Sequence, residues 1–245
     1  MLYIIGTGLH SYKDISIRSI EILKKCKKIY FENYTSIQQA PICELSNFLN
    51  KKIYILDRNS VETEEMFFEE SKYDDISILV VGTPMFATTH TGLLITAKQL
   101  NIKVEVIHNA SIQNVLGCLG LYSYNFGKTI SIPYFTDTWK PRSFLDNINQ
   151  NRKINLHTLC LLDIKVDENR FMTANEALKQ ILMFDDIHEN FKVFVIARFG
   201  SPDQVIKYDT IKALIEKDFG NPLHSIVIPG EMDVIEKEMV EFLFN

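Results

Sequence analysis

The sequence predicts an α/β protein made of two α/β domains, the first built on a parallel sheet and the second on a mixed sheet. Short apolar runs of strand length alternate with helical patterns along most of the chain. This alternation stops once, at HNASIQNVLGCLGLYSYNFGKT, which contains Gly, Ser and Asn and has no sustained pattern. A chain of 245 residues, 46% hydrophobic and 23% charged, can bury a core in each half. We therefore expect domains over residues 1–110 and 111–245.

The first domain is expected to hold a parallel sheet, because its apolar runs are separated by helical stretches. One helix is expected over residues 14–26, with Asp14 as its N-cap and Ile17, Ile20 and Leu23 along one face. A second helix is expected over residues 88–100. The expected strands are residues 2–5, 29–31, 53–56, 76–81 and 104–107.

The second domain is expected to hold shorter strands and a polar stretch at residues 147–155, which makes a mixed sheet at least as plausible as a parallel one. Helical patterns occur at residues 173–183, 209–217 and 235–244. The expected strands are residues 130–132, 158–163, 193–197 and 225–228.

Charge and cysteine content exclude several classes of protein. The net charge of -5 and the pI of about 5.7 provide no basic field for direct nucleic-acid binding. The four cysteines form no CxxC or Cys/His pattern, so we expect neither a metal site nor a disulfide framework. The chain begins without a basic signal region and contains no apolar stretch of about 20 residues. We expect a cytoplasmic protein that is neither secreted nor inserted into a membrane.

Three polar loops follow expected strands of the first domain: Gly6-Thr7-Gly8-Leu9, GTPMFATTHT from residue 82, and HNASI from residue 108. The carboxyl ends of parallel strands share one edge, where ligands bind in such sheets. Position 11 is Ser11 where a dinucleotide-binding loop has its third glycine, so a nicotinamide cofactor is disfavoured. A plain turn, helix capping or a structural His90 would explain each loop alone. Their convergence is the stronger argument for a binding crevice.

Two weaker signals lie in the second half. HTLCLLDIK, residues 157–165, is a strand pattern that ends in charges, and Asp163 and Lys165 could form a solvated ion pair. PLHS, residues 222–225, contains His224, which could be a turn residue. The sequence contains no Ser/His/Asp order, no paired-carboxylate motif and no Walker loop.

Taken together, these stretches resemble the diphthine synthases, members of the tetrapyrrole-methylase-like (class III) methyltransferase family. HNASI, ATTHT, LLDIK and PLHS in this order are specific, whereas GTG alone is not. The resemblance runs essentially from end to end. It also rests on MLYIIGTGL with KDIS, ENYTS at 32–36, DR at 57–58, VVGTP, GCLGLY, NFG, SIPYFTDTWKP, LHTLC, FMTANEAL, ARFGSPDQ and DFGNPLHSIVIPG.

The resemblance implies a tetrapyrrole-methylase-like fold that binds S-adenosylmethionine in the cleft between two domains and releases S-adenosylhomocysteine. It also implies a homodimer. The positions that match the family's cofactor contacts are Leu9, Thr83, Phe86, Ser111, Ile112, Leu162, Phe199 and His224.

The implied substrate is translation elongation factor 2 whose target histidine carries a 3-amino-3-carboxypropyl group. Methylation of its amino nitrogen gives diphthine, and methylation of the carboxylate gives the methyl ester. The sulfonium charge already activates the methyl group, so positioning and a route for proton loss can suffice. We therefore assign no catalytic residue and no metal.

One loop departs from the family pattern Gly-Asp-Pro-Phe/Leu-Gly-Ala-Thr-Thr-His. Thr83 stands where the family has aspartate, and Phe86 stands where it has glycine or another small residue. Losing a charged hydrogen bond would weaken cofactor binding by about 1–3 kcal/mol, whereas contacts through the backbone would change little. Two alternatives stay open: a class III methyltransferase for a tetrapyrrole or ribosomal RNA, and a degenerate, non-catalytic binding protein of the same fold.

Overall fold

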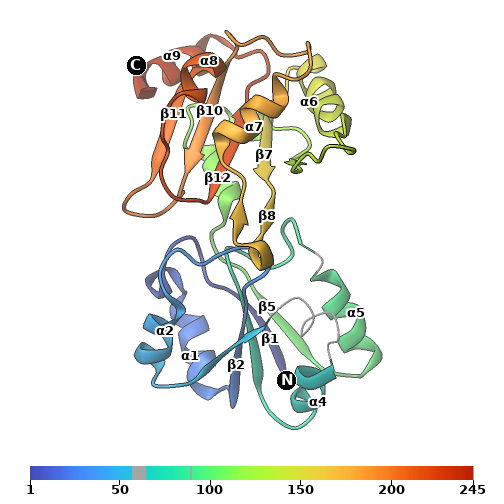
Figure 1. The fold of residues 1–245 in the computed structure, drawn as a ribbon. Helices are drawn as coiled ribbons and strands as arrows, with labels where there is room; N and C mark the ends of the chain where they lie inside the picture. Colours follow the sequence, from blue (N-terminus) through green and yellow to red (C-terminus); the bar gives the residue numbers. More distant parts are fainter. Residues whose placement is uncertain (57–64, 89, 245) are drawn as a thin grey trace. The chain divides into compact units, whose positions relative to one another are not determined.

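The computed structural model describes residues 1–56, 65–88 and 90–244, with the side chain of residue 65 left out. The chain divides into two compact units, Met1–Gln113 and Asn114–Asn245, which are described separately here (Figure 1). Asp57, Arg58 and Thr89, which belong to motifs of the family resemblance, lie outside the described residues. In the described part of the chain, no helix combines the length and apolar composition needed to span a bilayer.

Unit 1 is built on a five-stranded sheet in the order β3-β2-β4-β1-β5. Every pairing in it is parallel, which confirms the expected sheet type. The strands are rich in Ile, Leu and Val, as expected for a sheet covered on both faces. Their bounds are β1 Leu2–Gly6, β2 Lys28–Glu32, β3 Ile53–Leu56, β4 Ile76–Val80 and β5 Val104–Ile107.

Helices cover both faces of this sheet (Figure 1). On one face, Leu23 of α1 (Ile17–Lys25) and Leu45 of α2 (Ile42–Leu49) pack against Ile29 and Phe31. On the other face, α4 (Glu65–Ser71) and α5 (Thr91–Gln99) contribute Phe67, Phe68, Leu93 and Ala97 to a second core. With helices on both faces of the sheet, the polar loops lie at the carboxyl ends of the strands.

The beginnings of two helices differ from expectation. Asp14 does not cap a helix from residue 14, because it ends a short 3-10 helix, Tyr12–Asp14, whose N-cap is Ser11. Ser16 caps α1 instead and accepts from the N–H of Ser19. Ile17 at the first turn is 80% exposed, so the expected apolar face starts later in the helix. The N-cap of α5 is His90, so this helix begins later than the expected residue 88, and the His90 side chain makes no capping hydrogen bond.

Unit 2 is built on a second five-stranded sheet, in the order β11-β10-β12-β7-β6. β6 pairs in parallel with β7, while the other pairings are antiparallel, so the sheet is mixed as expected. A small hairpin of β8 and β9 extends beyond β7. The bounds are β6 Ile130–Ile132, β7 Thr158–Leu162, β8 Ile164–Lys165, β9 Arg170–Phe171, β10 Lys192–Ala197, β11 Val205–Thr210 and β12 His224–Ile228.

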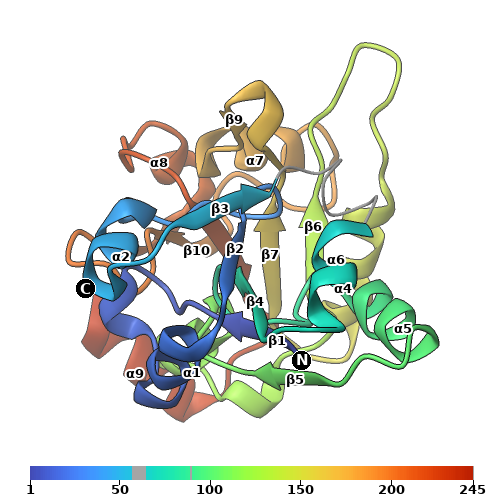
Figure 2. The same cartoon turned by 90° about the horizontal axis from the view of Figure 1, so that it is seen from below.

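One face of this sheet buries a large core beneath α6 (Ser143–Lys153), α7 (Ala174–Ile181) and α8 (Ile211–Ile215). α9 (Val234–Phe244) lies on the other face, where Phe244 packs edge-on against Phe194. A capping box between Thr173 and Glu176 begins α7. Further 3-10 helices occur at Ile112–Gly117, Ser123–Asn125 and Val166–Glu168. Figure 2 shows β6 beside β7, with a long loop running from β6 to α6.

The β8–β9 hairpin, strand β11 and helix α6 of unit 2 were not expected. The helix expected from residue 209 begins at Ile211, because Val205–Thr210 forms strand β11 and Thr210 is the helix cap. α6 occupies the polar stretch around residues 147–155, where Phe144, Leu145 and Ile148 alone form its buried apolar side.

A buried His–Glu pair attaches α9 to the rest of unit 2. Nε2 of His157 lies 3.0 Å from Oε1 of Glu236, and Nδ1 of His157 accepts from the N–H of Gly230 at 3.0 Å. The same carboxylate accepts from the N–H of Tyr122 at 2.7 Å. Burial acts to raise the pKa of Glu236, but the hydrogen bonds from Tyr122 and His157 outweigh it and lower the pKa. His157 therefore donates from Nε2 to a carboxylate that stays charged.

Candidate functional site

The first and second polar loops of unit 1 are joined backbone to backbone. The N–H of Gly8 donates to the carbonyl of Gly82 at 3.1 Å, and the N–H of Gly82 donates back to Gly8 at 2.8 Å. β1 lies between β4 and β5 in the sheet, so all three loops emerge side by side. The structure thus brings together the three loops that the sequence placed at one edge.

Glycine is needed where these loops meet. A Cβ atom on Gly6 would lie 2.5 Å from the carbonyl oxygen of Gly82, which is closer than real Cβ contacts allow. Gly8 and Gly82 have φ angles of +82° and +72°, which L side chains rarely adopt. The glycines therefore let these loops pack directly against one another and adopt backbone angles that other residues rarely take.

The third loop is fixed to the other two by Asn109. Its Nδ2 donates to the carbonyl oxygens of Gly6 and Asp14, both at 3.0 Å. Its main-chain N–H donates to Oγ1 of Thr83 at 3.2 Å, and the same hydroxyl lies 3.2 Å from Nδ1 of His108. Thr83 thus supplies an oxygen acceptor to the third loop without supplying a charge.

Five of the predicted cofactor-binding residues lie in these loops. Leu9, Thr83, Phe86 and Ile112 are half-buried, and Ser111 is buried. A Cβ atom on Gly82 would lie 3.3 Å from Cβ of Ser111, so the second and third loops are in contact here. Phe86 lies between Met85 and Ala87, whose φ angles of +71° and +52° give this loop a left-handed path.

A buried carboxylate stands at the end of the neighbouring strand β2. Glu32 accepts hydrogen bonds from the N–H groups of Tyr34 and Thr35, both at 2.7 Å, and from the Thr35 hydroxyl at 2.6 Å. Nε2 of the buried His90 lies 3.4 Å from its Oε2. Burial alone would raise the pKa of Glu32, but the nearby His90 ring and the hydrogen bonds from Thr35 and Tyr34 lower it. His90 is thus a buried partner of a charged carboxylate.

The remaining three predicted residues lie at the same end of neighbouring strands in the unit 2 sheet. Ala197 pairs with His224, and Ser225 pairs with Leu161, so Leu162 at the end of β7 lies next to His224 at the start of β12. Phe199 follows two residues after the end of β10 at this end. Leu162 and His224 are buried, and Phe199 is half-buried.

His224 is a buried strand residue and not the turn residue considered from the sequence. Its Nδ1 accepts from the N–H of Ala174 at the start of α7, at 3.2 Å. Its Nε2 lies 3.1 Å from the carbonyl oxygen of Asn221. Burial lowers the pKa of His224. The ring is thus neutral, with its proton on Nε2.

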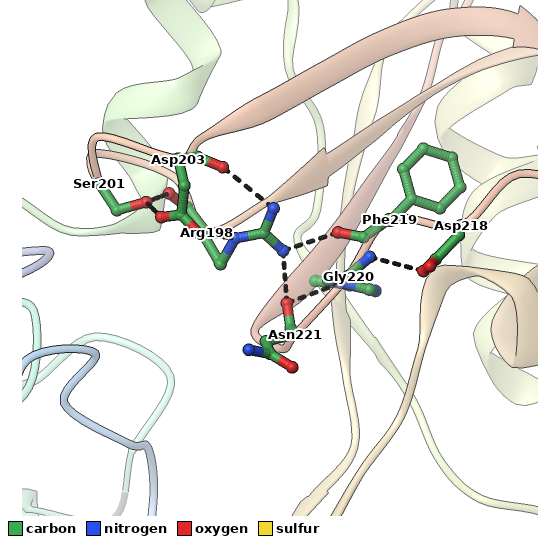
Figure 3. A network of polar contacts seen from close by, with 8 residues as sticks. Arg198, Ser201, Asp203, Asp218, Phe219, Gly220 and Asn221 are labelled. Atoms are coloured by element: carbon green, nitrogen blue, oxygen red, sulfur yellow. Dashed lines mark hydrogen bonds and ion pairs between the residues drawn. The ribbon is translucent and has the colours of Figure 1, made fainter.

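Arg198 joins the ARFGSPDQ and DFGNPLHS stretches (Figure 3). Its Nη1 donates to the carbonyl oxygens of Phe219 and Asn221, both at 2.6 Å, and its Nη2 donates to the carbonyl of Asp203 at 3.0 Å. Its Nε lies 2.6 Å from Oδ2 of Asp203. Arg198 adopts a φ of +50° directly before Phe199, so this network also fixes the backbone at a predicted cofactor position.

The ion pair considered between Asp163 and Lys165 does not form. Oδ2 of Asp163 accepts from the N–H of Tyr134 at 3.0 Å, whereas Nζ of Lys165 pairs with Oε1 of Glu168 at 3.2 Å. Asp163 therefore fixes the end of β6 against the end of β7. Within the described ranges, no group of three or more His, Cys, Asp or Glu side chains is arranged to hold a metal ion.

Sequence reasoning left Glu32, Asn109 and Arg198 without individual roles. Each lay in a stretch that carried the family resemblance, and that was the available signal. Their partners are mostly main-chain atoms distant in sequence, as for Asn109 and Gly6. Periodicity does not reveal such contacts.

Comparison with known proteins places the chain in context. Residues 1–215 match the tetrapyrrole (corrin/porphyrin) methylases. The chain is 47% identical over 267 residues to a diphthine methyl ester synthase from Dictyostelium discoideum, with 98% of this chain and 97% of the relative covered. A crystal structure described as a candidate diphthine synthase from Entamoeba histolytica has a TM-score of 0.91 at 38% identity, covering 100% of this chain and 98% of that one. A diphthine synthase crystal structure has a TM-score of 0.92 at 32% identity, with coverage of 99% and 95%.

Proposed function

Because the chain belongs to the tetrapyrrole (corrin/porphyrin) methylase family, we propose that it is an S-adenosylmethionine-dependent methyltransferase of diphthamide biosynthesis. Its substrate is elongation factor 2 whose target histidine bears a 3-amino-3-carboxypropyl group. The products are diphthine or its methyl ester, together with S-adenosylhomocysteine. The observation that carries the proposal is the similarity to diphthine methyl ester synthases over nearly the full length of both chains.

The loops of unit 1 fit a cofactor with neutral polar groups. Nδ1 of His10 and Oγ1 of Thr88 are buried and lack a hydrogen-bond partner in the part of the chain that the structure describes. Such atoms are expected to meet water or a ligand. The proposed contacts are Leu9, Thr83, Phe86, Ser111 and Ile112 from unit 1, and Leu162, Phe199 and His224 from unit 2.

S-Adenosylmethionine supplies, when bound, a methyl group on a positively charged sulfur. The protein must hold the substrate nitrogen or carboxylate oxygen in line with that methyl group, at about 3–3.5 Å. The amine attacks in its neutral form and can release its proton to water, so this chemistry requires no side chain as a base. Rigid loops, such as those joined by Gly8, Gly82 and Asn109, suit this positioning role.

Mass spectrometry of elongation factor 2 that carries the unmethylated amino-carboxypropyl histidine tests the proposal. Incubation with this protein and S-adenosylmethionine should give successive methyl additions at that side chain. Methylation of a tetrapyrrole or ribosomal RNA, offered in parallel reactions, would instead favour the alternative substrates. A folded protein that binds no S-adenosylmethionine and transfers no methyl group to any of the three would favour a degenerate, non-catalytic binding protein.

A variant pair tests the proposed cofactor contacts. Leu9→Trp places a bulky ring beside the Gly8–Gly82 bridge and should weaken S-adenosylmethionine binding at least about ten-fold in calorimetry. Leu100→Trp, at an exposed position after α5, is the matched control and should leave affinity unchanged. Equal affinity in both variants would remove Leu9 from the proposed site.

We also propose that the protein is a cytoplasmic homodimer, in line with a translation-factor substrate. The support within unit 2 is the surface of α9, which exposes several large apolar side chains, including Phe242 at 83%. Exposed apolar patches of this kind favour protein interfaces. Phe242→Ser should convert a dimer to a monomer in mass photometry, whereas Tyr124→Ser, at another exposed aromatic residue of unit 2, should not. The exposed apolar residues of α9 are Val234, Ile235, Met239, Phe242 and Leu243.

A further inference from the structure

The SIPYFTDTWKP stretch contributes none of the proposed cofactor contacts, yet it lines a groove of about 280 Å³ in unit 2. Ser131 lies on β6, Pro133 and Trp139 lie in the loop that follows, and Asn147 lies on α6. The groove is therefore bounded by a strand, a loop and a helix that lie together in sequence between residues 128 and 147. Figure 2 shows this loop standing out from the end of β6.

The strand at the groove has an unpaired side. Among the described residues, β6 is the last strand of its sheet and pairs only with β7. The carbonyl oxygen of Ile132 points toward β7 and accepts a hydrogen bond from the N–H of Asp163 at 3.2 Å. In a parallel pair, alternate residues bond to the partner strand, so Ile130 and Ile132 face β7. The N–H and carbonyl of Ser131 therefore face the open edge, where an extended chain can add.

Trp139, the chain's single tryptophan, is 53% exposed beside this edge. The turn that presents it is closed by two hydrogen bonds with Thr136, both at 3.0 Å. The loop is also anchored at its start, because the N–H of Phe135 donates to Oε1 of Gln180 at 3.0 Å. The indole thus sits on an ordered loop, and an aromatic held in this way loses little entropy on binding.

The charge of the groove differs from that of the whole chain. Lys128 is the charged residue among those that line the groove, and it is exposed. Its Nζ donates to the neutral amide of Asn147 at 3.0 Å. The chain carries a net charge of -5, so a positively charged groove contrasts with its average surface. The positive charge of Lys128 complements an acidic segment and not a basic one.

We propose that this groove docks an extended, acidic segment of the protein substrate, which adds to the edge of β6 at Ser131 and packs an apolar side chain against Trp139. Strand addition gives main-chain hydrogen bonds, and an exposed aromatic gives the anchor that dominates such interfaces. The proposal rests on the proposed function, in which the substrate is a folded protein. Lys128 supplies the charge preference.

Steady-state methylation of elongation factor 2 tests the groove. Trp139→Ala should raise KM for the factor about ten-fold or more, with kcat within about two-fold and the cofactor Kd unchanged. Tyr73→Ala, which removes an exposed aromatic from unit 1, is the matched control and should leave KM unchanged. Lys128→Glu should raise KM more than Lys128→Met, because the charge-reversed groove repels an acidic segment.

Direct binding of the elongation factor to immobilised protein separates the groove from the reaction. A wild-type protein that binds the factor more tightly than Trp139→Ala does, but transfers no methyl group, supports the groove and contradicts the proposed function. Equal binding and equal KM for wild type and Trp139→Ala overturn the groove proposal, as does a wild-type protein that does not bind the factor. Loss of dimer mass in Trp139→Ala would identify the groove as an interface between two copies, which also overturns it.

Discussion

Nδ1 of His224 accepts a hydrogen bond from the N–H of Ala174, the first residue of α7, at 3.2 Å. An imidazole that accepts at Nδ1 and donates at Nε2 to the carbonyl of Asn221 has no place for a second proton. The contact therefore joins the start of α7 to the start of β12 only while His224 is neutral.

This contact predicts a pH dependence of stability. Burial lowers the folded-state pKa of His224 below its ordinary value of 6.5, so the unfolded chain binds the proton more readily. The stabilisation is complete above pH 6.5 and is lost as the pH falls below it. In urea unfolding, the free energy of unfolding should fall less between pH 7 and pH 5 for His224→Gln than for wild type. His188→Gln, at an exposed histidine, should retain the wild-type loss. If His224→Gln showed the same pH dependence of stability as wild type, His224 would not be the group responsible.

Alanine substitutions at Gly8, in the first loop, and at Gly92, in α5, should have opposite effects on stability. Gly8→Ala forces a methyl group to within 2.5 Å of Cβ of Asp14 at a φ of +82°, and should lower the free energy of unfolding by about 2 kcal/mol or more. Gly92→Ala, in α5 with no atom within 4 Å of the new Cβ, should be neutral or stabilise by up to about 1 kcal/mol. Chemical denaturation measures both. Similar effects at the two positions would argue against strain at Gly8.

The Arg198 network predicts a large cost of truncation. Arg198→Met leaves the buried carbonyl of Phe219 without its donor, removes one of the two donors of the Asn221 carbonyl, and should cost about 3 kcal/mol of unfolding free energy. Arg18→Met removes an exposed guanidinium that pairs with Glu105 and should cost less than about 1 kcal/mol. Denaturant midpoints at fixed pH compare the two variants. A cost for Arg198→Met no greater than that for Arg18→Met would contradict a structural role for this network.

Two substitutions at position 83 separate the role of the Thr83 hydroxyl as a hydrogen-bond acceptor from the effect of having no charge there. Thr83→Val removes the oxygen that accepts from the N–H of Asn109 and should cost about 1 kcal/mol of stability. Thr83→Asp restores the family's carboxylate, keeps an acceptor, and should leave stability within about 0.5 kcal/mol. The two variants are compared by thermal unfolding without ligand. A larger loss in Thr83→Asp than in Thr83→Val would show that the loop does not accommodate a charge.

Much of the fold could be predicted because strands such as Ile53–Leu56 and Val104–Ile107 are apolar runs between polar loops. β11 was missed because Lys207 and Asp209 interrupt its pattern, and α6 because most of its residues are polar. These two elements are specified by partners, namely β10 and the buried core, and not by their own periodicity.

The candidate site was predictable as a set of loops but not as a set of contacts. The expected parallel sheet puts the loops after β1, β4 and β5 on one side, and the strand order, which was not predicted from the sequence, makes them neighbours. The roles of Asn109 and Arg198 depend on carbonyl groups up to 103 residues away in the sequence. Main-chain carbonyls are present at every position, so the sequence does not mark which ones these side chains reach.

The position of Glu236 in the chain has a consequence for synthesis on the ribosome. Its carboxylate accepts from His157 and Tyr122, residues made long before it, and it lies in α9, after the last strand of the unit 2 sheet. The sheet of unit 1, by contrast, is complete once Ile107 has been made. Unit 1 can therefore fold while translation continues, whereas His157 stays without its acceptor until α9 has left the exit tunnel. A ribosome that stalls before residue 236 would release a chain with one finished unit and one unit whose sheet lacks α9 on one face.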